Sequence, residues 1–176
     1  MTSTTLPDAG ATLSPADRLF PDLDAELETT RRAIASVPED RLDWQPHAKS
    51  MTLGRLASHL AELPRLATIV ASTPEFAFEP AKFKQAEFRT TAEMLAAFDA
   101  LSREMRDGIR ALSWEQMDAH WTMRVGDHVV VQGAKGAVLR QLGLSHMTHH
   151  RAQLGVYLRL LGVPVPKVYG PSADEQ

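Results

Sequence analysis

The sequence predicts an all-α protein, a four-helix bundle with a long crossover connection and a small β-hairpin before the last helix. Three observations support this fold class. Four long segments carry the apolar spacing of helices, a connector rich in proline and phenylalanine separates the second from the third, and one short stretch before the fourth alternates as strands do. The length of 176 residues suits a single domain.

The first helix is expected from about Ser14 to Val37. Pro15 suits the first turn of this helix, and Pro38 ends it. The expected apolar stripe consists of Leu19, Leu23, Leu27, Ile34 and Val37. Residues 1–14 are polar and contain helix-breaking residues, which predicts a flexible N-terminus, so the bundle domain is expected to span residues 15–176.

The second helix is expected from about Thr52 to Ser72, with Thr52 or Ser50 as its N-cap. Residues 74–89 form the expected crossover. The segment from Thr90 to Glu93 has the pattern of a capping box, which predicts the start of the third helix there, and apolar positions continue to Leu112.

The predicted hairpin and the last helix follow. Residues 121–125 alternate, Gly126 and Asp127 can turn, and residues 128–131 are rich in β-branched side chains. The last helix is expected from about Ala134 to Leu161, with Gly162 as the residue that ends it.

Composition and charge exclude several functional classes. The chain has 19 basic and 22 acidic residues and a net charge of -3, which argues against a nucleic-acid-binding protein that binds mainly by charge. Cysteine is absent, which excludes disulfides, thiolate metal ligands and a cysteine nucleophile. The start lacks the features of a secretory signal, and no apolar run reaches the length of a membrane span, so a cytoplasmic location without membrane association is expected.

Three histidines form a candidate metal site. His146 and His150 are four residues apart in the last helix, about 40° apart around its axis, and project from its apolar face. Two imidazoles one turn apart can bind one metal ion. His59 lies on the apolar face of the second helix. Three neutral histidines from facing helices would leave a coordination position open, as in catalytic sites.

Competing interpretations exist for each of these histidines. A single inward histidine is most often a hydrogen-bonded core residue, and only the three together favour a metal. His149 lies about 60° from His146 and could replace either neighbour as ligand, orient one of them, or face solvent. Helical geometry prefers His146 and His150.

Further residues have expected positions at the candidate site or at the surface. Glu62 follows His59 by about one turn and could hydrogen-bond a ligand, but a solvated position at the rim is favoured. His47 precedes the second helix and could lean over the mouth of the site. Trp44 is expected to anchor its loop on the bundle, and His120 and His128 are expected at the surface.

Several segments, taken in order, resemble the DinB-like (DinB/YfiT) family of metalloenzymes. The similar segments are residues 37–50 (the loop after the first helix), 56–64 (the first histidine motif), 146–154 (the HxxxHR-x-Q motif), and 158–166 and 169–175 (the C-terminal signature). The resemblance covers about residues 15–176. It implies a four-helix bundle, a homodimer, and a divalent metal on His59, His146 and His150, and it demotes His149.

The resemblance also implies activities, since characterised relatives transfer small thiols onto electrophiles, isomerise maleylpyruvate with thiol help, or hydrolyse amide-type bonds. A three-histidine zinc site brings the pKa of bound water to about 7 and would deprotonate a bound thiol. Zinc or nickel is the favoured ion, and iron or manganese also fits imidazole ligands.

The favoured function is a small-thiol S-transferase acting on an electrophilic small molecule, because a chain without cysteine must take its sulfur from a low-molecular-weight thiol. The alternatives are a metal-dependent hydrolase of a small amide-type substrate and a non-catalytic, metal-binding or ligand-binding dimeric module of a stress response. A homodimer is also expected because the helices offer apolar positions in excess of one core, as does the connector with Phe76, Phe78, Phe83 and Phe88.

Overall fold

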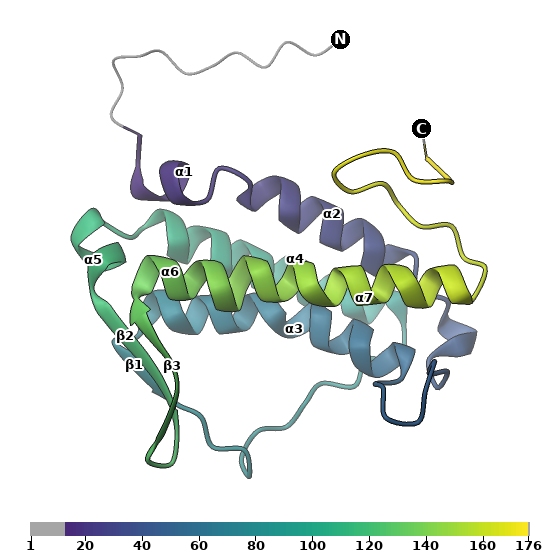
Figure 1. Ribbon diagram of the computed structural model, residues 1–176, viewed down its shortest axis with the longest axis horizontal. Helices are drawn as coiled ribbons and strands as arrows, with labels where there is room; N and C mark the ends of the chain where they lie inside the picture. Colours follow the sequence, from purple (N-terminus) through teal and green to yellow (C-terminus); the bar gives the residue numbers. More distant parts are fainter. Residues whose placement is uncertain (1–12, 176) are drawn as a thin grey trace.

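The computed structural model describes residues 13–175, so the expected flexible N-terminus lies almost wholly outside the described residues. The expected four-helix bundle is confirmed (Figure 1). Its four long helices are α2 (Leu23–Ala35), α3 (Leu53–Ser72), α4 (Thr91–Arg110) and a last helix that ends in α7 (His146–Leu160). Helix α2 packs against α4 and α7, and α3 packs against the same two helices from the other side.

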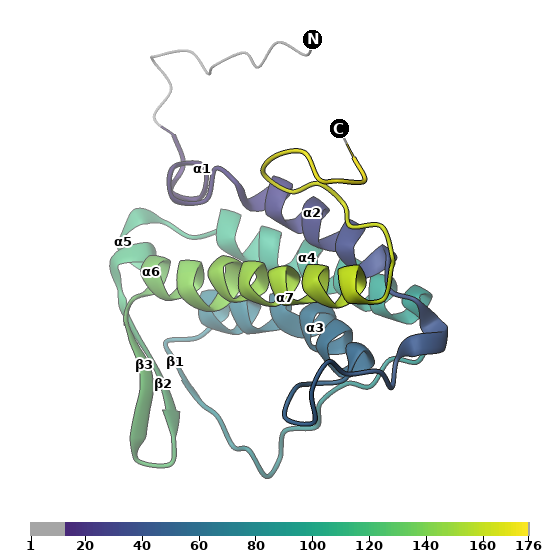
Figure 2. The same ribbon diagram turned by 45° about the vertical axis from the view of Figure 1, so that its right-hand side comes forward.

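The connection between α3 and α4 crosses the whole length of the bundle. The two helices run in the same direction, since Gly108 near the end of α4 lies against Ala71 near the end of α3. The chain must therefore return along the bundle before α4 begins, and residues 73–90 do so (Figures 1 and 2). This confirms the predicted long crossover.

The first helix differs from the sequence prediction. A continuous helix from Ser14 to Val37 is wrong: α1 (Pro15–Leu19) is separated from α2, and α2 ends at Ala35. The break coincides with Pro21, which has no backbone N–H and disfavours helical geometry at Phe20. The expected first-turn position of Pro15 is confirmed.

Capping side chains set the starts of the next helices. The Thr52 hydroxyl accepts a hydrogen bond from the Arg55 N–H, and Thr90 and Glu93 form the predicted capping box. Two short helices were not predicted: a 3-10 helix at Glu39–Arg41 and α5 (Trp114–Asp118). The second has its own capping box, formed by Ser113 and Gln116, so a local signal for it was present.

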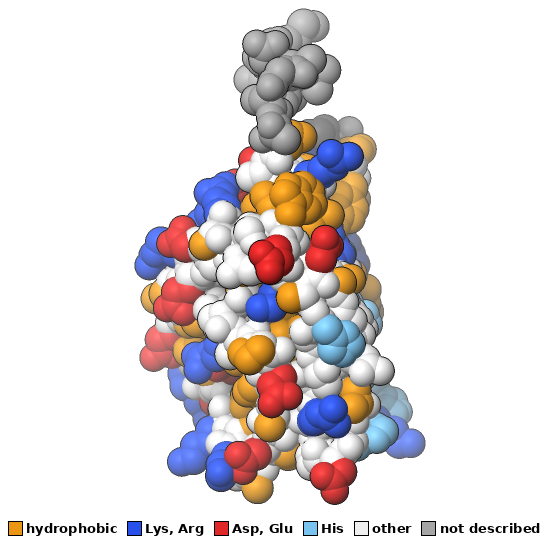
Figure 3. Space-filling model, turned by 90° about the vertical axis from the view of Figure 1, so that its left-hand side faces the viewer, with side chains coloured by type: hydrophobic (Ala, Val, Ile, Leu, Met, Phe, Trp, Pro, Cys, Tyr) orange, Lys and Arg blue, Asp and Glu red, His pale blue; other side chains and the backbone are white. Residues whose placement is uncertain are grey.

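The predicted hairpin is part of a three-stranded sheet at one end of the bundle. Strands β2 (His120–Val125) and β3 (His128–Ala134) pair antiparallel, and Gly126 takes a φ of 57° in the turn between them. The crossover contributes β1 (Glu75–Ala77), which pairs parallel with β2 and was not predicted. Seen from this end, acidic and basic side chains are interspersed over the surface (Figure 3).

The last helix contains a wider, π-helical turn. It runs through α6 (Lys135–Leu139), the π-helical residues Arg140–Ser145 and α7 without interruption. A Cβ on Gly143 in this turn would lie 3.2 Å from Ala67 of α3 and 3.2 Å from Met105 of α4. The glycine therefore allows a close approach of the last helix to α3 and α4, directly before His146.

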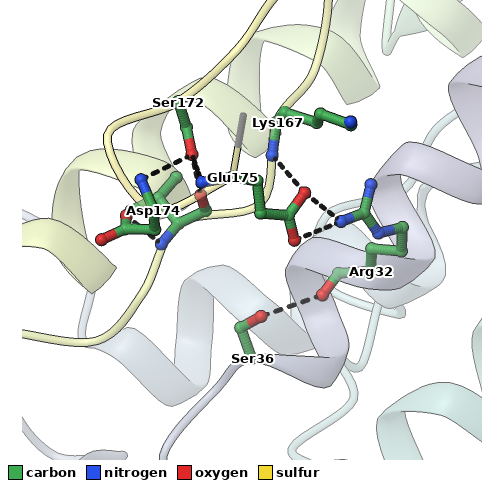
Figure 4. A network of polar contacts seen from close by, with 7 residues as sticks. Arg32, Ser36, Lys167, Ser172, Asp174 and Glu175 are labelled. Carbon is green, nitrogen blue, oxygen red and sulfur yellow. Dashed lines mark hydrogen bonds and ion pairs between the residues drawn. The ribbon is translucent and has the colours of Figure 1, made fainter.

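The C-terminal tail folds back onto α2 and is held by charged side chains. The Glu175 carboxylate pairs with Arg32 of α2 at 2.5 Å and accepts the Lys167 N–H, while the Ser172 hydroxyl accepts the N–H groups of Asp174 and Glu175 (Figure 4). No helix within residues 13–175 is both long and apolar enough to cross a membrane.

The connector phenylalanines are used largely within the chain. Phe76 and Phe88 pack against the hydrophobic core, and the Phe78 ring lies 6.2 Å from Phe76 and 5.2 Å from Phe83. Phe83 remains 48% exposed. These side chains therefore offer less surface for a partner than the sequence suggested, and the homodimer stays a prediction.

Candidate metal centre

Helices α3 and α7 lie side by side and bring three histidines together (Figure 2). His59 comes from α3, and His146 and His150 come from the first two turns of α7. One ring nitrogen from each of the three lies within 4.8 Å of the others. The ring centroids of His59 lie 5.4 Å from His146 and 4.6 Å from His150, and the last two are 4.7 Å apart.

The spacing and the donor set suit a divalent metal ion. Nε2 of His146 lies 2.9 Å from Nε2 of His150. Two nitrogens bound to one tetrahedral ion lie about 3.3 Å apart, so this pair needs only a small adjustment, while the three nitrogens as a set lie within 4.8 Å. Three imidazoles suit zinc, nickel and iron, and they leave the remaining positions of the ion to other ligands.

Hydrogen bonding directs one lone pair of His150 into the cluster. Nδ1 of His150 lies 2.7 Å from Oε1 of Gln153, one turn further along α7. Because this amide oxygen can only accept, Nδ1 carries the proton and Nε2 keeps its lone pair. Gln153 thus orients the imidazole. The sequence reasoning missed this role, although the spacing of three residues was a usable signal.

The hydrogen-bonding groups of the three histidines are not all paired, as they would be in ordinary core histidines. Nδ1 of His146 is buried and has no hydrogen-bond partner among residues 13–175. Buried polar atoms without partners are costly and are uncommon outside functional sites. The π-helical turn next to His146 is a second feature that often marks such sites.

Burial keeps these imidazoles in the neutral form that a metal ion requires. Desolvation, with smaller contributions from the charges of His150, His146 and Arg55, lowers the pKa of His59 to about 4. Burial also lowers the pKa of His146 and of His150, and the nearby His149 acts in the same direction on both. At neutral pH all three therefore have a lone pair available.

We expect the metal-free protein to lose stability as the pH falls from about 6.5 to about 4. An unfolded histidine has a pKa near 6.5, whereas the folded His59 has a pKa of about 4, so the unfolded state binds more protons between these values. The free energy of unfolding then rises with pH across this window. Urea denaturation in the presence of a chelator, at several pH values, measures it.

The matched variants for this measurement are His59→Gln and His47→Gln. Carboxyl groups also titrate near the lower end of the window, so the comparison of slopes isolates the histidine. The slope of stability against pH is expected to be shallower in His59→Gln and unchanged in His47→Gln. Equal slopes in wild type and both variants would contradict the attribution of this pH dependence to His59.

The other predicted site residues lie outside the cluster. His149 is exposed, although its ring centroid is 4.9 Å from His150. His47 is exposed and its Nδ1 accepts the Lys49 N–H. Trp44 packs edge-on against Tyr157 of α7 at 5.5 Å, in keeping with its expected role as a loop anchor.

The favoured position of Glu62 at a solvated rim is wrong. Its side chain is only 14% exposed, and its carboxylate accepts the Ala86 N–H at 2.9 Å and lies 3.6 Å from Arg65. Glu62 therefore attaches the crossover to α3 and does not hydrogen-bond a histidine. The sequence contained no signal for this contact, because the two residues are 24 positions apart.

The four-helix bundle with a long crossover and the three converging histidines place this protein among helical bundles with a candidate metal centre between their helices. This chain belongs to the DinB family, whose sequence profile matches residues 12–176. It is similar to the uncharacterized protein YrdA of Bacillus subtilis, with 26% identity over 159 residues, which cover 90% of each chain.

Solved structures support the fold. A DinB-like protein from Bacillus cereus matches with a TM-score of 0.65 at 16% identity, over 86% of this chain and 95% of that one. YfiT from Bacillus subtilis matches with a TM-score of 0.60 at 17% identity, over 90% of this chain and 94% of that one. YfiT is described as "a probable metal-dependent hydrolase with an unusual four-helix bundle topology".

Proposed function

We propose that this protein is a metal-dependent enzyme in which His59, His146 and His150 hold one divalent ion, and that it transfers a low-molecular-weight thiol to an electrophilic small molecule. The observation that supports the proposal best is the convergence of three ring nitrogens within 4.8 Å. Zinc or nickel fits the three imidazoles, as iron and manganese do. When bound, the ion supplies Lewis-acid chemistry that acidifies thiols or water.

The chain's own residues hold and orient this site. Gln153 fixes the tautomer of His150, and burial keeps the three imidazoles neutral. Tyr157, two turns beyond His150, donates its hydroxyl to the Met51 carbonyl and contacts Trp44, which attaches the preceding loop to α7. These contacts favour a rigid wall on one side of the cluster.

An external thiol is favoured as the nucleophile because the chain contains no cysteine. Within residues 13–175 no carboxylate joins the three histidines, so the cluster offers no acidic side chain as a general base. A nucleophile acidified by the ion would need no such base. Hydrolysis of a small amide is the second candidate, since the same site would serve water and since YfiT is described as a probable metal-dependent hydrolase.

Thiol-dependent turnover is the expected result that tests this proposal. Metal-loaded protein is incubated with chlorodinitrobenzene and mycothiol, bacillithiol or glutathione, and in parallel with p-nitroanilide amides and no thiol. We expect thioether formation that requires both protein and thiol. It is expected to disappear in His150→Ala and to persist in His149→Ala, whose side chain lies outside the cluster.

The other outcomes decide between the alternatives. Amide cleavage at the same rate with and without thiol would favour the hydrolase. If fully metal-loaded protein converted neither the electrophile nor the amides, this would contradict enzymatic activity. It would favour a dimeric module that binds a metal or ligand without turnover. Thioether formation that continues undiminished in His150→Ala would exclude the cluster as the reacting site.

A further inference from the structure

A small cavity lies at the start of α3, where Ser58, the residue before His59, is part of its lining. It has a volume of about 200 Å³. Among the residues that line it are Arg55 and Ser58 of α3 and Arg89 and Glu87 of the crossover. The volume is below the range of pockets for drug-sized ligands, so it suits a group of a few heavy atoms.

Arg55 is a charged side chain without a partner in this cavity. Its Nη1 is buried and has no hydrogen-bond partner among residues 13–175, and no carboxylate of those residues lies within ion-pair distance of its guanidinium. Burial lowers the pKa of Arg55, against the opposing effect of Glu62 and Glu87. A buried, unpaired nitrogen on a charged group costs free energy, and such exceptions to polar pairing are expected at functional sites.

The neighbouring acids are committed elsewhere. Glu62 accepts the Ala86 N–H and lies 3.6 Å from Arg65, while Glu87 pairs with Arg89 at 3.3 Å. Asp43 also lines the cavity, but it is exposed to solvent. The acids near Arg55 therefore leave its inward nitrogen free for an anion from outside the chain.

The backbone N–H groups at the N-terminus of α3 are already paired, so they do not form a separate binding site for an anion in this cavity. The N–H groups of Leu53 and Gly54 donate to backbone carbonyls of the preceding loop, and the Arg55 N–H donates to the Thr52 hydroxyl. The first backbone donors of the helix are thus satisfied. The Arg55 side chain, with its unpaired Nη1, is therefore available as a donor to a ligand in this cavity.

Arg55 is also close to the histidine cluster. It precedes His59 by four residues, so the two side chains are neighbours on one face of α3. Ser58, which lines the cavity together with Arg55, directly precedes His59 in the chain. A small molecule bound at Arg55 would therefore lie near His59 of the cluster.

We propose that Arg55 binds an oxyanion of the substrate, a carboxylate or a phosphate, while another group of the same molecule lies at the three histidines. The proposal rests on the proposed function and narrows its substrate class to small anionic compounds. The planar guanidinium suits either oxyanion, since both can accept two parallel hydrogen bonds.

The test measures binding by cobalt-loaded protein, with the thiolate-to-cobalt absorption band as the signal. The probes are 3-mercaptopropionate, 2-mercaptoethylphosphonate and the neutral 3-mercaptopropionamide. We expect the anionic thiols to bind about 10–100-fold more tightly than the amide, as is typical of one charge-assisted hydrogen bond. The stronger of the two anionic probes identifies the oxyanion.

Three variants assign the preference to one side chain. Arg55→Gln is expected to reduce the ratio of affinities for the anionic and neutral thiols to about one. Arg55→Lys, which keeps the charge, is expected to retain part of the preference for the anionic thiols. Arg89→Gln is the matched control, because Arg89 lines the same cavity but is paired, and it is expected to keep the full preference.

The two proposals fail in different ways. Protein that binds no cobalt, or that gives no thiolate band with any probe, contradicts the metal centre and with it the role of Arg55. Cobalt binding with a thiolate band but equal affinity for charged and neutral probes overturns the role of Arg55 alone. A preference that survives Arg55→Gln also overturns it.

Discussion

Replacing Arg151 with methionine is expected to lower the free energy of unfolding by about 3–5 kcal/mol, the range typical of a broken buried ion pair. Nη2 of Arg151 lies 2.8 Å from the Glu26 carboxylate of α2, and the two side chains are only 3% and 8% exposed. The guanidinium also donates to the Thr30 hydroxyl and to the Tyr169 hydroxyl of the tail. Its removal would leave a buried carboxylate without its cation.

The measurement is chemical denaturation of wild type and variant at neutral pH. Arg106→Met is the matched control, because Arg106 pairs with Asp24 at 2.6 Å but the Asp24 side chain is 58% exposed, and such pairs contribute at most about 1 kcal/mol. The double variant Glu26→Gln, Arg151→Met is expected to recover part of the loss. A loss below about 1 kcal/mol in Arg151→Met would show that the ion pair does not hold α7 on α2.

The position of Arg151 links this stability to the three-histidine cluster. It directly follows His150 in α7, and it contacts Glu26 and Thr30 of α2, whereas His146 and His150 face His59 of α3. The ion pair therefore fixes the rotation of α7 between α2 and α3. We infer that it helps to aim His146 and His150 at His59.

Replacing His150 with alanine is expected to weaken metal binding more than 100-fold. Loss of a residue that only orients a ligand typically costs about 10–100-fold in metal affinity, and loss of a ligand itself should exceed that range. His150 is the best supported of the three, since it is buried, lies 2.9 Å from His146 and has its tautomer fixed by Gln153. Elemental analysis and competition with a chelator measure the effect on untagged protein.

Two variants of neighbouring residues provide the metal affinities with which His150→Ala is compared. Gln153→Ala is expected to reduce affinity by about 10–100-fold, because the ring would lose its orienting acceptor but not its nitrogen. His149→Ala is expected to change it little, since that side chain is exposed. If His149→Ala lowered the metal content more than His150→Ala, the wrong neighbour would have been assigned.

Features that depend on adjacent residues were predicted well. The capping box at Thr90 and Glu93, the cap at Thr52 and the turn at Gly126 each follow from the chemistry of a few consecutive residues. The shared face of His146 and His150 follows from helical geometry alone, and it holds because both lie within α7, after the π-helical turn. The break at Pro21 belongs to the same local class and could have been predicted.

Features that join distant segments were not predicted. Strand β1 has three residues and exists only because β2 lies beside it, and the paired residues are 47 positions apart in the chain. The contact of Glu62 with Ala86 and the unpaired guanidinium of Arg55 depend on where the crossover passes over α3. The residue pattern within the crossover or within α3 does not indicate that these two segments contact each other.

The sequence by itself determined four amphipathic helices, the caps of two of them, the hairpin, and three inward histidines in a chain without cysteine. The tertiary structure decided that His59 meets the other two, because that contact requires α3 and α7 to lie side by side and the last helix to approach closely at Gly143. It also decided which nearby charges are paired. Glu62 and Glu87 are compensated by the crossover and its neighbours, whereas Arg55 is not, because packing alone sets which polar atoms lose their water.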